Sequence, residues 1–428
     1  MERENKRTLE NGILMYSYKN PSLNGFYISL YLRAGCMYEP EGDVGITHFL
    51  EHIAIRNVNA EMGGTLYSLL DRYGIEFNAS TYNDMVQFYV SGARKNFEIG
   101  SRILAKILSP IVLSADEIRT EGGRIKAEIR ENDERGSLAN FTSSIVFEGT
   151  PLSRMITGSV SGVSAINGTR LEKYRRSVFN KDNIFLYVTG SFDDGDLDAL
   201  AELVGACELY PGVANDNVAE LPEKFFKRDG TVHIKNADYT MVRFTFDMDM
   251  SKISYAESDI LYDTLLGGYN SRFFIEMSEK EGLFYDLCGS CDRYKNIGTL
   301  SFYYEVKPSQ IYTAIERTLD ILRSFVTSPL TDEECMKAGY VDNAYMLYDD
   351  ARELNFTFAY DNHILDAGYG SIDERIAAYS AVTPERIAEI ADMLFRPENL
   401  ILTLKGRRKK IDKEKIESLI RSFADEKN

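Results

Sequence analysis

Hydrophobic and polar residues follow the same order in two separate parts of the chain. In the first part, the alternation over 26–32 and the run Phe88-Tyr89-Val90 predict β-strands, because successive strand side chains point to opposite faces. Helically spaced apolar residues follow over 103–108 and stop at Ser109-Pro110. A second helix is expected after Ser114, which forms a capping-box pattern with Glu117.

The same pattern returns in the second part. Residues 242–246 and the run Phe302-Tyr303-Tyr304 predict strands, and apolar residues over 315–322 predict a helix that stops at Ser328-Pro329. The sequence Thr331-Asp332-Glu333-Glu334 then repeats the capping box. The offset is 214 positions between the two Phe-Tyr strands and 217 between the two caps, so only a small insertion separates the copies. The chain is therefore predicted to contain an internal duplication.

The duplication predicts two domains of similar fold, 1–215 and 216–428. Residues 210–222 are rich in Gly, Asn, Asp and Pro, show no periodicity, and are the expected boundary. Strands and helices mix without regular βαβ alternation, which favours an α+β fold. Each domain is expected to be a mostly antiparallel sheet flanked by helices.

Composition narrows the classes of function. A chain of 428 residues is long enough for two or more cores, and 44% hydrophobic with 27% charged residues is typical of a globular protein. The net charge of −17 argues against nucleic acid or an anionic membrane as an obligate partner. No apolar run approaches 18 residues, and residues 1–7 lack the apolar core of a signal peptide.

Cysteine usage indicates a reducing environment. Five cysteines are scattered along the chain, which fits thiols of a cytoplasmic protein better than a disulfide framework. Cys288 and Cys291 have a C-x-x-C spacing, but in the strand expected there they face opposite sides. No second pair and no histidine stands beside them, so neither a redox nor a metal role is expected.

The most informative segment is His48-Phe49-Leu50-Glu51-His52. It uses two of only four histidines in the chain. Residues four apart on a helix share a face at roughly 5–6 Å Cβ separation, so His48 and His52 can hold one metal ion. Glu51 then lies close enough to reach a metal-bound water. His-x-x-Glu-His is the inverzincin order of the zinc-peptidase motif, and packing alone is a poor explanation for it.

A catalytic zinc needs a third protein ligand and an open position for water. The helix expected after Ser114 offers Glu121 and Glu128, which are two turns apart on one face. One of them can ligate while the other orients a ligating imidazole; spacing does not say which, and a charged solvated face is the alternative. The pair Gly122-Gly123 costs roughly 1 kcal/mol per glycine relative to alanine and indicates close approach of another backbone.

With these residues the chain resembles the inverzincin metallopeptidases, a family that includes pitrilysin, insulin-degrading enzyme and the mitochondrial processing peptidase subunits. The resemblance covers nearly the whole chain, through residues 45–52, residues 77–81, the duplication, and a Glu located 76 positions after His52. It implies one Zn²⁺ per chain, with Glu128 as the third ligand and Glu121 supporting the site. It also implies that an edge strand binds extended substrate, through Asn78, Ala79, Ser80 and Thr81.

The second half departs from the metal-binding pattern. Its matching helix, around 259–266, has no histidine, and Tyr345 stands where Glu128 would be matched. In the family such a half forms the opposite wall of a chamber and grips substrate with an Arg and a Tyr seven residues apart. Here Tyr285 is present but Ser278 takes the place of the Arg, and serine cannot make a charged bidentate contact.

The missing Arg suggests that a second subunit contributes to the substrate-binding site. We expect a dimer, and specifically a heterodimer in which a metal-free homologue supplies the intact Arg/Tyr pair. The alternative is a homodimer in which Arg272 or Lys280 substitutes for the missing Arg.

The function expected from these features is that of a zinc endopeptidase that hydrolyses short or unfolded peptides, possible substrates being the leaders of precursor peptides. Glu51 is expected to act as the general base. Two alternatives stay open: a non-catalytic assembly subunit of the same family, and a zinc hydrolase acting on other substrates. The intact His, His and Glu set argues against the assembly subunit, since a degenerate subunit has no reason to keep it.

Overall fold

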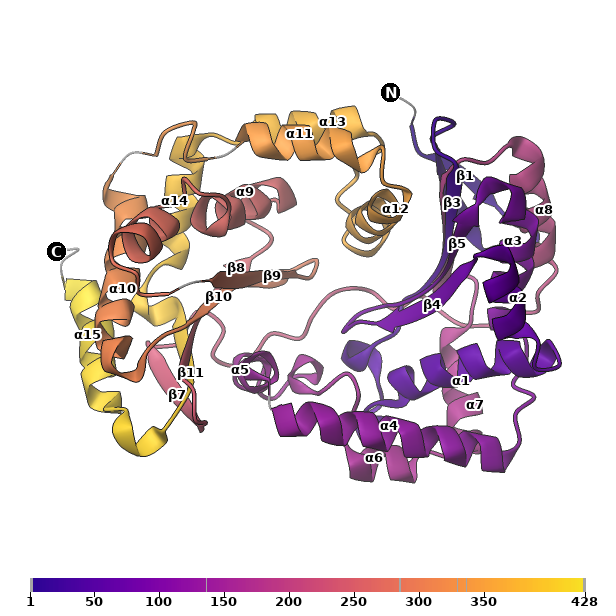
Figure 1. Cartoon of the computed structure of the whole chain (residues 1–428), viewed down its shortest axis with the longest axis horizontal. Helices are drawn as coiled ribbons and strands as arrows, with labels where there is room; N and C mark the ends of the chain where they lie inside the picture. Colours follow the sequence, from indigo (N-terminus) through magenta and orange to yellow (C-terminus); the bar gives the residue numbers. More distant parts are fainter. Residues whose placement is uncertain (1–2, 136, 285, 329, 336, 426–428) are drawn as a thin grey trace. The chain divides into compact units, whose positions relative to one another are not determined.

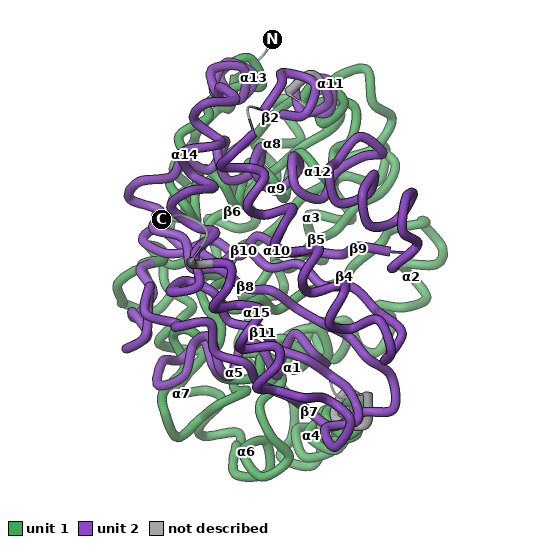
Figure 2. Tube along the Cα trace, turned by 90° about the vertical axis from the view of Figure 1, so that its left-hand side faces the viewer, with its two compact units in different colours: residues 1–135, 154–217, 344–373 green, residues 136–153, 218–343, 374–428 purple. Residues whose placement is uncertain are grey.

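The computed structural model describes residues 3–135, 137–284, 286–328, 330–335 and 337–425. The chain forms two compact units, each built from three stretches of sequence (Figure 2). Unit 1 comprises residues 1–135, 154–217 and 344–373, and unit 2 comprises residues 136–153, 218–343 and 374–428. Each unit therefore contains a segment that lies in sequence within the other half.

Unit 1 contains a six-stranded sheet of order β1-β2-β6-β3-β5-β4 (Figure 1). Its strands are β1 (Asn5–Thr8), β2 (Leu14–Lys19), β3 (Gly25–Leu32), β4 (Glu76–Thr81), β5 (Val86–Ala93) and β6 (Ile184–Gly190). Only the β2–β6 pair is parallel. The outermost strand next to β5 is β4.

Unit 2 repeats this arrangement in a five-stranded sheet of order β7-β11-β8-β10-β9. Its strands are β7 (Thr231–Asn236), β8 (Met241–Asp249), β9 (Leu287–Arg293), β10 (Ile297–Glu305) and β11 (Leu400–Gly406). Again a single pair, β7–β11, is parallel. Without β1 the two sheets have the same order and the same strand directions, which confirms the α+β fold with an internal duplication.

Helices of unit 1 cover both faces of its sheet. α3 (Phe97–Ala105) packs on β3 and β5 beside α8 (Asp194–Gly205), and α12 (Ala351–Ala359) packs on β3 and β6 from the opposite face (Figure 1). The remaining helices are α1 (Ile46–Glu61), α2 (Leu66–Tyr73), α4 (Ala115–Arg135), α6 (Val160–Ala165) and α7 (Gly168–Val178).

A buried amide on α12 explains why this late segment belongs to unit 1. The side chain of Asn355 is fully buried; its Nδ2 donates to the carbonyl of Tyr187 on β6 at 2.9 Å. The hydroxyl of Tyr31 on β3 donates to Asn355 Oδ1 at 2.9 Å. Because a buried amide without partners would be costly, this asparagine fixes α12 on the sheet.

Unit 2 receives an early segment in return. α5 (Leu138–Val146) packs on β11, where the hydroxyls of Thr142 and Thr403 are 2.6 Å apart. α10 (Ile311–Thr327) packs between α14 (Pro384–Leu394) and α15 (Lys413–Asp425). The other helices are α9 (Tyr255–Leu266), α11 (Lys337–Leu347) and α13 (Ile372–Ser380). α13 spans the point where the chain leaves unit 1 for unit 2. Residues Phe274–Lys280 form a π-helical segment.

The predicted elements agree with these boundaries except at the end of the run over 103–108 and at the cap of Thr331. The helical run over 103–108 is α3 followed by a 3-10 turn, Lys106–Leu108. Ser114 and Glu117 form their capping box at the start of α4. Thr331 and Glu334 form the same two hydrogen bonds, but residues 332–335 make a turn and α11 begins at Lys337.

The division of the chain at 215/216 stays a prediction. Residues 208–222 contain neither helix nor strand, as the sequence indicated. The compact units, however, are not two continuous halves, because α5 and α12 are exchanged between them.

Candidate metal centre

The helix that carries the motif is held at its N-terminus by a carboxylate from outside it. Gly45, at the N-cap of α1, has φ 91°, a left-handed conformation suited to glycine. Its N–H donates to Glu39 Oε2 at 2.8 Å, and Thr47 N–H donates to Glu39 Oε1 at 2.9 Å. Burial raises the pKa of Glu39 and outweighs these two hydrogen bonds, which lower it. Glu39 thus satisfies two N–H groups at the positive end of α1.

Close contact between α1 and α4 brings the third carboxylate to the histidines. A Cβ placed on Gly122 would lie only 3.1 Å from Cζ of the buried Phe49, so glycine permits this approach. Gly123 has no heavy atom within 4 Å of the same position. Close helix packing therefore explains the first glycine of the pair, and nothing in the structure explains the second.

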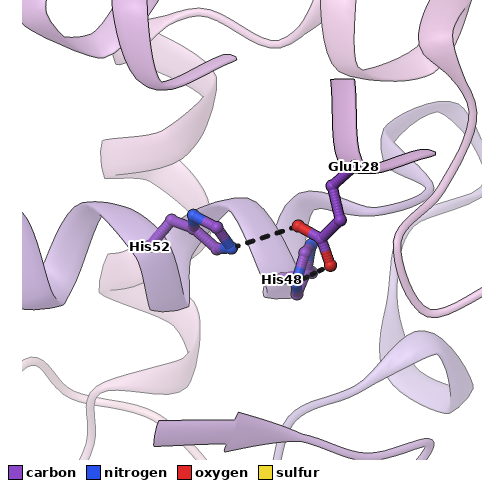
Figure 3. A group of neighbouring side chains, drawn as sticks. All are labelled: His48, His52 and Glu128. Carbon is purple, nitrogen blue, oxygen red and sulfur yellow. Dashed lines mark ion pairs between the residues drawn. The ribbon is translucent and has the colours of Figure 1, made fainter. Parts of the chain in front are cut away.

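Three side chains from these helices converge in unit 1 (Figure 3). His48 Nε2 lies 3.8 Å from Glu128 Oε1, and His52 Nε2 lies 3.7 Å from Glu128 Oε2. One ligand atom from each residue can be chosen so that all three lie within 4.8 Å of one another. Ligand atoms about 2.0–2.2 Å from a tetrahedral zinc would be separated by roughly 3.4 Å. The donor set of two imidazoles and one carboxylate fits a zinc centre with an open position.

Glu121 occupies a different place from Glu128. Its buried carboxylate lies 3.0 Å from His52 Nδ1 and accepts a hydrogen bond from Arg56 at 2.6 Å and one from Arg124 at 3.3 Å. Burial by itself raises the pKa of Glu121, but the bonds to His52 and Arg56 outweigh it and the pKa is lowered. The geometry therefore distinguishes the two carboxylates that spacing left equivalent. Glu128 faces the Nε2 atoms of both histidines, and Glu121 faces Nδ1 of His52.

The two imidazoles differ in their electrostatic surroundings. Burial, helped by the neighbouring His52, lowers the pKa of His48 to about 4. Burial also acts to lower the pKa of His52, but Glu121, Glu51 and Glu128 outweigh it and the pKa is raised. His48 is thus neutral at neutral pH and offers a free lone pair, whereas carboxylates around His52 favour a positive charge at that point. A metal cation bound there would supply this positive charge.

Glu51 points toward the neighbouring strand. The hydroxyl of Thr81, the last residue of β4, donates to Glu51 Oε2 at 2.9 Å. Burial raises the pKa of Glu51 above its ordinary value; His52 and the Thr81 bond lower it, and Glu128 raises it further. A carboxylate with a raised pKa is suited to accept and return a proton near neutral pH.

The four residues proposed to contact substrate, Asn78, Ala79, Ser80 and Thr81, all lie on β4. This strand pairs with β5 on one side, and no other strand among the described residues pairs with its outer edge. An unpaired edge can accept an added strand. Asn78 uses its own Oδ1 to accept the N–H of Ala79 at 2.9 Å.

The substrate-gripping residues expected in the second half are only partly described. Tyr285 lies outside the described residues. Ser278 donates to the carbonyl of Phe284 at 3.3 Å. Arg272 is held by Glu334 at 2.6 Å and by the Ser324 carbonyl at 2.6 Å, and Lys280 pairs with Glu276 at 2.7 Å. Both basic side chains therefore already have partners within unit 2.

Three further residues support the site and were not among those that the sequence pattern predicted. Arg56 lies one turn after His52, a spacing that could have drawn attention to it. Glu39 lies in the segment just before α1, and Thr81 lies on β4; neither is related to the motif by helix or strand periodicity.

In the part of the chain that the structure describes, His48, His52 and Glu128 are the one group of three or more His, Cys, Asp or Glu side chains placed to hold a metal ion. Helix α9, the counterpart of α1, has no histidine; its Asp259 pairs with Arg293 at 2.5 Å and accepts from Tyr379 at 2.6 Å. Cys288 and Cys291 lie on β9 and share no disulfide. None of the described helices is long and apolar enough to cross a membrane.

Comparisons with known proteins agree with this geometry. Residues 14–160 match the family model Insulinase (Peptidase family M16), and residues 165–338 match the Peptidase M16 inactive domain. The chain belongs to peptidase family M16, which confirms the inverzincin resemblance. The first matched region contains His48, His52 and Glu128, and the second contains none of them.

Individual relatives are distant but cover nearly the whole chain. An "Uncharacterized zinc protease" of Rickettsia felis is 25% identical over 94% of this chain and 96% of its own length. A protease from Helicobacter pylori has a similar fold, with a TM-score of 0.83 at 15% identity, covering 95% of this chain and all of that one. A chain of complex III2 from Candida albicans has a TM-score of 0.80 at 12% identity, covering 97% and 99%.

Proposed function

We propose that this protein is a zinc-dependent endopeptidase with one Zn²⁺ per chain, held by His48, His52 and Glu128. The observation that carries the proposal is the convergence of these three side chains, at 3.7–3.8 Å between imidazole and carboxylate atoms. Membership of family M16 and relatives named zinc proteases support it. Glu121 is proposed to orient His52 through Nδ1, with Arg56 holding Glu121 in turn.

The chemistry proposed for the site is attack of water on a peptide carbonyl. Zinc bound there would polarise the carbonyl and lower the pKa of its water to about 7. Glu51 takes the proton of the attacking water as general base and delivers it to the departing amine. Thr81 holds the Glu51 carboxylate through the 2.9 Å hydrogen bond. His48 and His52 stay unprotonated, since a protonated imidazole cannot ligate.

The proposed substrates are short or unfolded peptides, among them leader segments of precursor peptides. Such chains can add a strand to the outer edge of β4, at Asn78, Ala79, Ser80 and Thr81. A folded protein cannot offer an unpaired strand there without local unfolding. Because Thr81 is both the last residue of this edge and the hydrogen-bond donor to Glu51, substrate binding and proton transfer share one element.

We further propose that the working enzyme is a heterodimer with a metal-free homologue. Ser278 replaces the family's Arg, and the two nearby substitutes, Arg272 and Lys280, are already paired with Glu334 and Glu276. A partner with an intact Arg/Tyr pair would complete the substrate grip to which Tyr285 is proposed to contribute. Full activity of the chain purified alone would refute the heterodimer, and a homodimer would then be the working form.

The experiment that tests the peptidase proposal combines metal analysis with cleavage of a quenched fluorescent peptide library. We expect one zinc per chain, loss of activity with 1,10-phenanthroline, and recovery on adding zinc. If zinc is absent after reconstitution, and no peptide is cut with or without co-expressed homologues, the proposal fails.

The second candidate function is a non-catalytic assembly subunit. The fold match to a chain of complex III2 favours considering it. A stable complex that forms equally well with wild-type chain and with His48→Ala, and that never cleaves peptide, would support this alternative.

The site of action is proposed to be a reducing compartment such as the cytoplasm, because the cysteines form no disulfide framework.

A further inference from the structure

A cavity of about 350 Å³ lies within unit 2, which contains none of the three proposed zinc ligands. It is bordered by α5, the edge strand β7, the 3-10 turn Arg408–Lys410 and the start of α15, and β7 packs directly against α15 (Figure 1). The lining residues are Phe141, Val232, His233, Ile234, Arg408, Ile411 and Lys413. Elements from three distant parts of the sequence thus build one small concave site.

Every charged residue of this lining is basic. His233, Arg408 and Lys413 converge on the cavity, although the whole chain carries a net charge of −17. Among the described residues, neither Arg408 nor His233 has a carboxylate within ion-pair distance, whereas the adjacent Arg407 lies 3.4 Å from Asp238. Lys413 has a loose contact with Glu417 at 3.4 Å. The guanidinium of Arg408 is therefore left to an outside partner, and the ammonium of Lys413 is only loosely paired.

The other lining residues are apolar, and the two cationic side chains reach the cavity from the surface. Phe141, Val232, Ile234 and Ile411 complete the lining, and Arg408 and Lys413 are exposed. The volume lies at the lower end of small-molecule sites, which span about 300–1,000 Å³. A guanidinium beside an ammonium matches the oxygens of a phosphate group, with Arg408 able to bind two of them at once.

From these observations we propose that the cavity binds a small, multiply charged phosphate anion of about the size of pyrophosphate. The shared chemistry is a pair of linked phosphates, which either a free polyphosphate or a nucleotide can supply. This site is separate from the peptidase proposal, so either can fail without the other.

His233 provides an internal reporter of the bound anion. Its pKa is lowered by burial and by the charges of Lys413 and Lys224, and Glu148 acts in the opposite direction. Arg408 also faces the cavity, and Asp412 caps α15 by accepting the N–H of Lys415. A bound polyanion would neutralise this positive surrounding and raise the pKa of His233. The chain has only four histidines, so the resonance of His233 can be assigned by a single His233→Gln variant.

The test is isothermal titration of the full-length protein with pyrophosphate, orthophosphate, ATP and AMP, together with NMR titration of the histidine ring protons. We expect pyrophosphate to bind with a dissociation constant below 1 mM, more tightly than orthophosphate by about tenfold. ATP binding as well as pyrophosphate, with AMP much weaker, would identify a nucleotide source; binding of pyrophosphate alone would identify free polyphosphate. In either case the pKa of His233 should rise on binding.

The matched variants are Arg408→Gln and Lys409→Gln. Both remove one positive charge from the same exposed run, but only Arg408 lines the cavity. Arg408→Gln should weaken pyrophosphate binding at least tenfold, and Lys409→Gln should change it less than twofold. Equal losses in the two variants would show diffuse attraction to a basic surface and overturn the proposal, as would an unchanged His233 pKa at saturating pyrophosphate. Circular dichroism melting of both variants checks that the fold is intact.

Discussion

Helices α1 and α9 occupy the same place in the two copies of the fold but use polar residues differently. α9 is capped by its own sequence, through Ser254 and Glu257. The N-cap residue of α1, Gly45, supplies no side-chain cap, and the helix start is held by Glu39 from the segment before it. On α9 the partly buried Asp259 pairs with Arg293; on α1 the polar side chains are His48 and His52, which face Glu128.

The same contrast extends to the buried charges of the two units. In unit 2, Arg228 and Asp247 form a buried bidentate pair, at 2.6 and 2.8 Å, with almost no exposure. In unit 1, the buried Glu121 is shared between Arg56 and His52. Breaking a closed pair leaves one charge buried and unpaired, which destabilises a fold, whereas a carboxylate that faces an imidazole can tune a metal ligand. One duplicated fold thus contains a buried ion pair in unit 2 and, in unit 1, a buried carboxylate placed beside an imidazole.

The largest effect is expected from Glu51→Gln. The substitution keeps the shape of the side chain and removes its ability to accept a proton, so peptide hydrolysis should fall by about 10²–10⁴-fold while zinc stays bound. Rates measured with a fluorogenic peptide and zinc measured by atomic absorption check both halves of this statement. Asp259→Asn on α9 is the matched control, because we place no chemistry there. Near wild-type turnover by Glu51→Gln would remove Glu51 from the mechanism.

Breaking the buried pair of unit 2 should mainly affect stability. Asp247→Asn leaves Arg228 buried without a counter-charge, and we expect a loss of about 3–5 kcal/mol in the free energy of unfolding. Urea denaturation measures it. Asp249→Asn, at the more exposed end of the same strand, disturbs a pair with Lys252 and should cost less than about 1 kcal/mol. Equal losses would contradict the structural role assigned to the Arg228–Asp247 pair.

Glu121→Gln should weaken the metal site without removing a ligand. The amide cannot stabilise His52 as the carboxylate does, and loss of such an outer partner typically lowers metal affinity about 10–100-fold. Competition with a zinc-sensitive chelator dye gives the affinity. Glu117→Gln on the exposed side of the same helix is the control and should leave zinc affinity unchanged. If Glu121→Gln binds zinc as tightly as wild type, the role assigned to Glu121 is wrong.

Thr81→Val tests the link between the edge strand and the general base. Loss of the hydrogen bond to Glu51 should lower kcat about tenfold, the equivalent of roughly 1.4 kcal/mol, with little change in KM. Thr81→Ser keeps the hydroxyl and should restore most of the rate. A change in KM alone would mean that Thr81 contributes only to substrate binding.

The smallest effect concerns pH. The native pKa of Glu121 is below its ordinary value of 4.5, so its ionised form stabilises the fold above that value, and the contribution is lost as pH falls through the native pKa. In metal-free protein, wild type should therefore lose more stability than Glu121→Gln between pH 6 and pH 3. Parallel losses in both proteins, measured by urea denaturation at each pH, would show that the charge of Glu121 does not stabilise the fold.

The sequence by itself determined the local features of this protein. The spacing of His48, Glu51 and His52 places them on one helical turn, the capping box at Ser114 marks where α4 starts, and the repeated pattern predicts the duplicated sheet. These features are readable because helix and strand periodicity relate residues only a few positions apart.

Only the tertiary structure decided which distant groups meet. It placed Glu128 opposite both Nε2 atoms and Glu121 beside Nδ1, brought Thr81 to Glu51, and exchanged α5 and α12 between the units. Spacing cannot settle these contacts, because two glutamates on one helix face present the same pattern. Their separation depends on how closely α4 approaches α1, and the lack of a side chain at Gly122 leaves room for Phe49 there.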